Sequence, residues 1–72
     1  MRQYHDHSDE EGYRAFLVTD DAETMGDFTD WLDNHSIGWK LDFDGDDLAT
    51  VWTDWIADKK LASLLKLTWG GQ

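Results

Sequence analysis

The stretch DFDGDD, residues 42–47, carries four carboxylates, and oxygen ligands at this density could bind calcium. Three of its aspartates match ligand positions 1, 3 and 5 of an EF-hand loop: Asp42, Asp44 and Asp46. That loop also requires glycine at position 6, glutamate at position 12 and flanking helices, whereas this chain has Asp47, Thr53 and strand-like flanks. Tight turns favour aspartate and glycine for their own geometry. We therefore interpret the stretch as a hairpin tip without a metal site, with weak divalent-ion binding by the three aspartates as the alternative.

Other combinations of reactive residues are sparse. The chain has no cysteine, no Gly-x-Ser-x-Gly elbow, no phosphate-binding glycine loop and no His-Glu-x-x-His motif. His5 and His7 could hold a transition metal, but they lie in residues 1–11, which we expect to be a flexible acidic arm. We predict a protein with no catalytic residues, no cofactor and no enzymatic activity.

The charge is strongly acidic and unevenly distributed. Sixteen acids and six bases give a formal net charge of −10, and residues 1–58 hold every acid but only three bases, Arg2, Arg14 and Lys40. Such a surface would repel nucleic acid and anionic membranes, so neither is expected as a direct partner. No apolar run is long enough to span a membrane, the first residues do not resemble a signal peptide and cysteine is absent, which together favour the cytoplasm.

The hydrophobic pattern predicts a single α+β domain over residues 12–72. Three segments are typical of strands: residues 13–19, 37–43 and 48–53. Helical spacing predicts one helix from Asp20, where Glu23 completes a capping-box-like start, and a second helix from residues 53–54. Because residues 65–69 alternate again, the order βαββαβ predicts a ferredoxin-like fold, with two helices on one face of an antiparallel sheet. The alternative is βαββα, in which the last segment belongs to a C-terminal helix.

The hairpin that contains the acidic tip has two possible registers. A four-residue turn at residues 44–47 pairs Trp39 with Trp52, whereas a two-residue turn pairs Ile37 with Trp52. We favour the longer turn, because the shorter one would place two aspartates opposite each other. Both registers put Trp52 on the side of Ile37, Trp39 and Leu41, which we expect the helices to cover. Loss of the Trp52 ring is then expected to cost about 3–5 kcal/mol.

The first predicted helix has four acids on one side: Asp20, Glu23, Asp27 and Asp30. At 100° per residue they fall within about 80° of one another, and Trp31 lies at the edge of this stripe. We interpret these five residues as a partner-binding surface with an aromatic anchor, and a solvated helix face is the simpler alternative. His35, at the end of the helix, is expected to bind the last helical carbonyl groups.

Two segments, FTDWLDNHSIGWKL and DKKLASLLKLTWGG, give the chain a likeness to known proteins. They resemble small uncharacterised acidic proteins of tailed bacteriophages, which pair a Phe-x-x-Trp-like helix motif with a tail of the type Asp-Ala-x-x-Phe-Lys-Leu-x-Trp. The chain departs from this tail at Leu65, where an aromatic residue is expected. The resemblance covers about half of the chain and implies a phage-type origin, in the cytoplasm of a host cell, with no catalytic residue to transfer.

Two functions remain as hypotheses. The first is a non-enzymatic modulator or inhibitor that occupies a basic surface of a host protein, with nucleic-acid mimicry as one form of this role. The alternative is an acidic, salt-adapted or solubility-driven domain of structural role, which forms a homodimer through its open sheet face. A minor metal-buffering role is a weaker third hypothesis.

Overall fold

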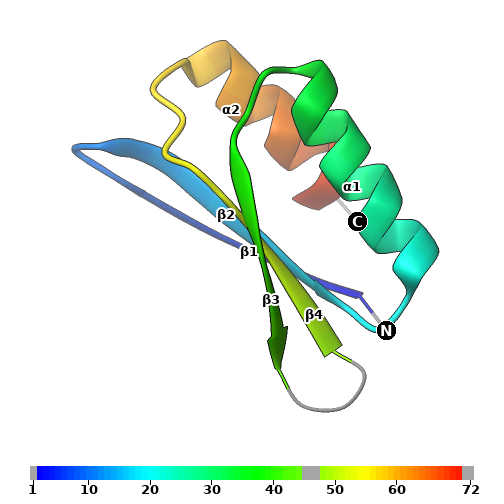
Figure 1. Cartoon of the computed structure of the whole chain (residues 1–72). Helices are drawn as coiled ribbons and strands as arrows, with labels where there is room; N and C mark the ends of the chain where they lie inside the picture. The colour runs from blue at the N-terminus through cyan, green and yellow to red at the C-terminus, as the bar shows by residue number, and fades with distance from the viewer. Residues whose placement is uncertain (1, 45–47, 71–72) are drawn as a thin grey trace.

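The computed structural model of the chain describes residues 2–44 and 48–70. Two hairpins alternate with two helices: β1 Arg2–Asp9, β2 Gly12–Thr19, α1 Ala22–Asn34, β3 Trp39–Asp44, β4 Leu48–Thr53, α2 Lys59–Leu65 and a π-helical turn, η1, Lys66–Gly70. The four strands form one antiparallel sheet in the order β1-β2-β4-β3. Both helices lie on the same side of this sheet, and no described element covers its other side (Figure 1).

The predicted α+β class is confirmed, but the ferredoxin-like order is wrong at both ends of the chain. The observed order is ββαββα rather than βαββαβ. The N-terminal segment predicted as a flexible arm contains β1, and the segment predicted as the last strand is helical. The alternative with a C-terminal helix describes the end of the chain correctly, although it also lacks β1.

Strand β1 went unpredicted because its side chains are mostly polar. It pairs with β2 along its whole length, from Arg2 opposite Thr19 to Asp9 opposite Gly12. These backbone hydrogen bonds do not depend on apolar side chains, so hydrophobic periodicity gives little sign of them. Among the described side chains of β1, Tyr4 packs against the hydrophobic core.

The C-terminal segment is helical because of how it begins and what it buries. Asp58 caps α2, since its Oδ1 accepts hydrogen bonds from the backbone N–H groups of Lys60 at 2.9 Å and Leu61 at 3.4 Å. Leu65 is fully buried at the end of α2, and Trp69 in η1 meets the ring of Phe28 edge-on at 5.0 Å. The alternating apolar residues at positions 65–69 therefore belong to α2 and the π-helical turn and do not form a strand.

The β3–β4 hairpin has a register that differs from both predicted ones. Leu41 lies opposite Val51 and Asp44 opposite Leu48, so three residues connect the strands, and these lie outside the described residues. Because side chains alternate along a strand, a shift of one residue moves every side chain of β4 to the other face. Val51 therefore faces the helices, and Trp52 lies on the uncovered side of the sheet, contrary to the prediction.

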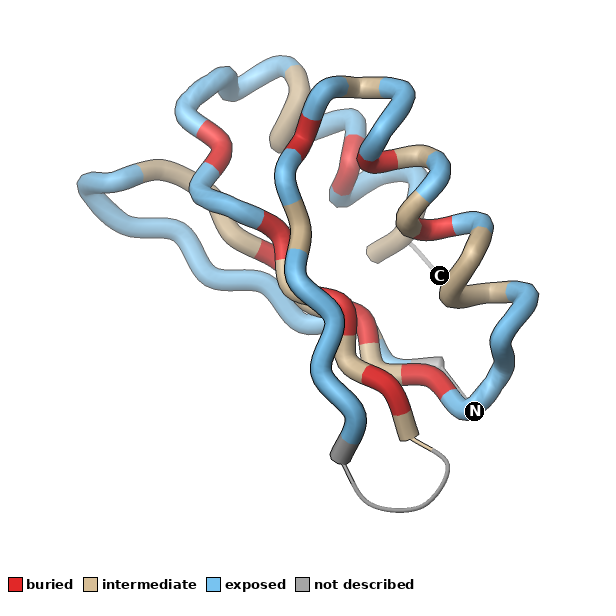
Figure 2. The backbone as a smooth tube through the Cα atoms, in the orientation of Figure 1, coloured by how far each residue is buried: buried red, intermediate tan, exposed pale blue. Residues whose placement is uncertain are grey.

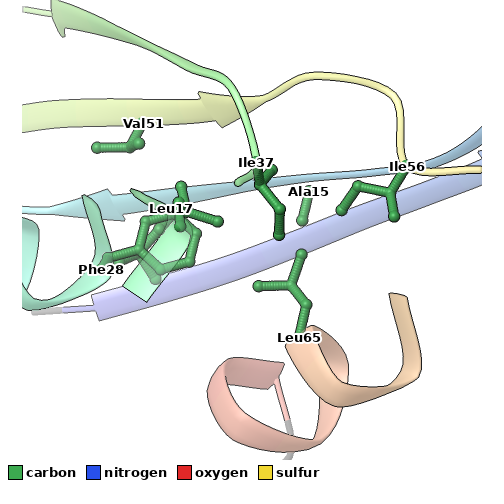
Figure 3. Close-up of a cluster of buried hydrophobic side chains, with 8 residues drawn as sticks. Ala15, Leu17, Phe28, Ile37, Val51, Ile56 and Leu65 are labelled. Carbon is green, nitrogen blue, oxygen red and sulfur yellow. The ribbon is translucent and has the colours of Figure 1, made fainter. Parts of the chain in front are cut away.

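The hydrophobic core lies between the sheet and the two helices (Figures 2 and 3). Its buried members come from the central strands, from the helices and from the connections: Ala15, Leu17, Val51, Phe28, Leu32, Leu65, Ile37 and Ile56. The hydroxyl groups of two buried threonines have hydrogen-bond partners within the chain. Thr53 Oγ1 accepts from the Ala15 N–H at 3.0 Å, and Thr19 Oγ1 accepts from the Asp21 N–H at 3.0 Å. The core is thus built on one face of the sheet only.

The position of Trp52 changes the expected effect of its removal. Its ring is partly exposed, stacks on Phe16 at 4.3 Å and lies 5.0 Å from the Arg14 guanidinium carbon. We expect Trp52→Ala to lower the free energy of unfolding by about 1–2.5 kcal/mol, the sum of an aromatic pair and a surface cation–π contact. Thermal denaturation followed by circular dichroism measures this loss. A variant that fails to fold would show that Trp52 belongs to the core after all.

Candidate functional site

Helix α1 begins one residue later than predicted. Asp21, not Asp20, is the N-cap, because its Oδ1 accepts from the Glu23 N–H at 3.0 Å and its Oδ2 from the Thr24 hydroxyl at 2.9 Å. Asp20 lies outside the helix, so the helical spacing that aligned it with the other acids does not apply to it. A carboxylate at this end of a helix is also stabilised by the helix dipole.

The other three predicted acids share one exposed side of α1. Glu23, Asp27 and Asp30 follow one another at i, i+4 and i+7, and all three are exposed. Successive carboxylates are therefore separated by about 5 Å along the helix axis. We call these three residues the acidic ridge. No described lysine or arginine forms an ion pair with the ridge.

Trp31 lies beside the ridge but is held by its own helix. Its ring is half-buried against the core and stacks on the His35 imidazole at 3.9 Å. His35 Nδ1 donates a hydrogen bond to the Trp31 carbonyl oxygen at 2.8 Å, which confirms the predicted role of this histidine at the helix end. One face of the indole is thus covered within the chain, and Trp31 offers a partner only its remaining exposed surface.

The predicted metal candidates are not brought together in the part of the chain that the structure describes. Asp42 is exposed on β3, Asp44 ends that strand, and Asp46 lies outside the described residues. No group of three or more histidines or acids that could hold a metal ion occurs among residues 2–44 and 48–70. His5 and His7 lie on the same side of β1, but each contacts an aromatic ring of another segment.

The sequence predicted an open side of the sheet but not which residues form it, and these residues make a second candidate surface (Figure 1). We call it the open face, and its residues are Gln3, His5, His7, Asp9, Arg14, Phe16, Val18, Lys40, Asp42, Leu48, Thr50 and Trp52. One row crosses all four strands, with His5 beside Phe16, Phe16 beside Trp52 and Trp52 beside Lys40. A sequence signal for its apolar part exists, because residues 15–18 are apolar at successive positions, which is typical of a strand covered on both faces.

The aromatic rings of the open face stack against one another. His5 stacks on Phe16 at 4.9 Å, and Phe16 stacks on Trp52. The Arg14 guanidinium continues this series between the rings of Trp52 and Trp55, at 5.0 and 5.7 Å from their centroids. Its Nε also donates to the Thr53 carbonyl oxygen at 3.1 Å, which holds the cation in place.

No protein-family model, curated protein or solved structure matches this chain. Within the described residues, the structure contains no helix with the length and apolar character needed to cross a membrane. What the protein binds is therefore inferred from the chemistry of its own surfaces.

A hydrogen-bonded pair of tyrosines ties β1 to β2 on the helix side of the sheet. Tyr13 OH donates to Asp6 Oδ2 at 2.9 Å, so the Tyr4 hydroxyl donates to Tyr13. Burial raises the pKa of Tyr4, and burial together with the hydrogen bonds to Tyr4 and Asp6 raises the pKa of Tyr13. Both phenols therefore stay protonated at neutral pH, and the pair acts as a structural link rather than as a base.

Proposed function

We propose that the protein is a non-enzymatic binding protein whose acidic ridge occupies a basic surface of another protein. The observation that carries the proposal is the exposed line of Glu23, Asp27 and Asp30 on α1. No lysine or arginine occurs in the sequence between Arg14 and Lys40, so the ridge has no cation within its own helix. Unpaired carboxylates attract a basic surface and increase the rate at which it associates.

The shape of the ridge supports this role. A helix holds its backbone rigidly, so three carboxylates spaced by about 5 Å keep a fixed geometry before a partner arrives. Charges on a preformed helix lose less backbone freedom on binding than charges on a mobile loop. A basic surface built to bind phosphate groups is one that such a row of acids could occupy, which is the proposed form of nucleic-acid mimicry.

The resemblance to phage proteins supports a choice of partner. A phage-type protein that binds a basic surface of a host protein would act as a modulator or inhibitor of that protein. In this proposal Trp31 contributes a partly exposed aromatic surface next to the ridge. Its contact with the partner would slow dissociation of the complex after the ridge has bound the basic surface.

Charge reversal on the ridge is expected to abolish partner capture. We would immobilise the parent chain and a Glu23→Lys/Asp27→Lys variant and compare the proteins that each retains from a bacterial lysate at low salt. Proteins bound through the ridge should be retained by the parent, lost with the variant, and released from the parent as salt is raised.

A second variant separates the ridge from net charge. Glu10→Lys/Glu11→Lys changes the net charge equally, but its substitutions lie in the exposed turn between β1 and β2. This control should retain the same proteins as the parent, and circular dichroism should show that all three chains are folded. If the ridge variant and the turn variant retain identical proteins, the ridge is not the binding surface.

A further inference from the structure

The open face is a side of the sheet that no described element covers, and it combines aromatic, aliphatic and cationic side chains (Figure 1). Phe16, Val18 and Trp52 lie side by side on the two central strands and are each partly exposed. A continuous apolar surface of this kind, left uncovered in a small protein, is typical of an interaction site. It is independent of the acidic ridge, which lies on the helix layer on the opposite side of the sheet.

The arrangement of the rings indicates what kind of partner fits. Because His5, Phe16 and Trp52 stack on one another, and Arg14 lies over Trp52, the ring faces are already occupied within the chain. Stacking of nucleic-acid bases needs free ring faces, so this surface is poorly suited to single-stranded nucleic acid. What it presents outward is ring edges and aliphatic groups, which suit a second protein surface packed directly against it.

The distribution of charge identifies the partner. Asp9 and Asp42 are the carboxylates among the described side chains of the open face, where they offset the charges of Arg14 and Lys40 and leave the face close to neutral. By contrast, residues 20–33 at and before α1 hold six acids and no lysine or arginine, so two copies would repel each other through that side. We propose that the open face is a homodimer interface and that its occupant is the same face of a second copy of this chain.

A two-fold arrangement also gives the charges of this face partners. No described carboxylate lies within ion-pair distance of Arg14 or Lys40 in the single chain. Both cations line a shallow hollow of about 410 Å³ together with Leu41, Asp42 and Trp52. In an isologous interface each contact occurs twice, so Asp42 of each copy can meet Arg14 or Lys40 of the other. The two sheets would then pack face to face about 10 Å apart.

The size of the face indicates how strong the dimer is. Four strands spaced by about 4.8 Å and about six residues long give a projected area of about 400 Å² per copy. Stable interfaces bury about 800 Å² per partner. The dimer is therefore weak and depends on protein concentration. Because each copy is strongly negative, added salt should strengthen the dimer by screening the repulsion between the acidic residues outside the open face.

The test is the mass of the protein in solution. Sedimentation of the parent chain, from micromolar to millimolar concentration and at low and high salt, should show an apparent mass that rises from 8.4 kDa towards twice that value. Val18→Lys places a cation at the centre of the open face and should keep the chain monomeric. Leu64→Lys makes the same change in charge at an exposed site on α2 and should leave the dimer intact.

Each other result overturns the proposal. A parent that stays at 8.4 kDa at every concentration and salt shows that the open face does not bind a second copy. A dimer that survives both Val18→Lys and Thr50→Lys, or that Leu64→Lys abolishes, shows that another surface forms it. Circular dichroism confirms that each variant is folded, and Thr50→Lys replaces Val18→Lys if the latter does not fold. The opposite salt dependence expected for ridge binding, which salt weakens, keeps this result separate from the proposed function.

Discussion

Replacing Phe28 by alanine is expected to remove a large share of the free energy of unfolding of this chain. Phe28 is fully buried in the core, where it joins α1 to the sheet and meets Trp69 of η1 at 5.0 Å. Loss of a buried aromatic ring costs about 3–5 kcal/mol through lost burial and the cavity that remains. At about 0.05–0.15 kcal/mol per residue, a chain of this length has a total stability of only about 4–11 kcal/mol.

Chemical denaturation of the parent and of Phe28→Ala, followed by circular dichroism, measures this loss. Phe43→Ala is a matched control, because the Phe43 side chain is 68% exposed on β3. The control should change the free energy of unfolding by less than about 0.5 kcal/mol, as is usual for surface substitutions. Equal effects of the two substitutions would contradict the location of the core.

Substitution of two glycines by alanine is expected to have effects of opposite sign. Gly12, at the start of β2, has φ +130°, and an added Cβ would lie 2.6 Å from the Ile56 carbonyl oxygen. This oxygen accepts from the Tyr13 N–H at 2.9 Å, and the Ile56 N–H donates back to the Tyr13 carbonyl oxygen at 2.7 Å. Gly12→Ala must therefore strain the backbone and disturb a bridge between β2 and the segment before α2. We expect a loss of about 2–4 kcal/mol.

Gly26→Ala is the matched control, since Gly26 lies within α1 and no heavy atom beyond the adjoining helix backbone lies within 4 Å of its added Cβ. Alanine in a helix interior is better than glycine by about 0.5–1 kcal/mol, so this variant should be more stable than the parent. Melting temperatures of the two variants give the comparison directly. A Gly12→Ala variant as stable as the parent would show that the β2 bridge to Ile56 is unimportant or differently placed.

The parts of the fold that the sequence predicted correctly are those with a strong local pattern. Helix α1 follows from the spacing of Phe28 and Leu32, and strand β2 from the apolar run at residues 15–18. Strand β1 depends on pairing with a distant segment and has no such pattern. The face of Trp52 depends on the number of residues in a turn, and an error of one residue there exchanges the two sides of β4.

The two candidate surfaces also differ in how far a local sequence pattern could predict them. The acidic ridge was predictable because helical spacing alone places Glu23, Asp27 and Asp30 on one side, while Asp20 was wrongly included because the helix starts after it. The open face combines residues from all four strands, and these become neighbours only once strand order and register are known. No local pattern contains that information.

The strand order also has a consequence for how the protein behaves when it is concentrated. All acids of the sheet belong to the two edge strands, with Asp6 and Asp9 in β1 and Asp42 and Asp44 in β3, whereas β2 and β4 contain none. An edge strand is a template on which another chain can add a strand and begin a fibril. A copy that paired edge to edge would bring carboxylates side by side. The placement of these four acids, of the sixteen in the chain, therefore opposes edge-to-edge pairing of copies of a chain rich in tryptophan.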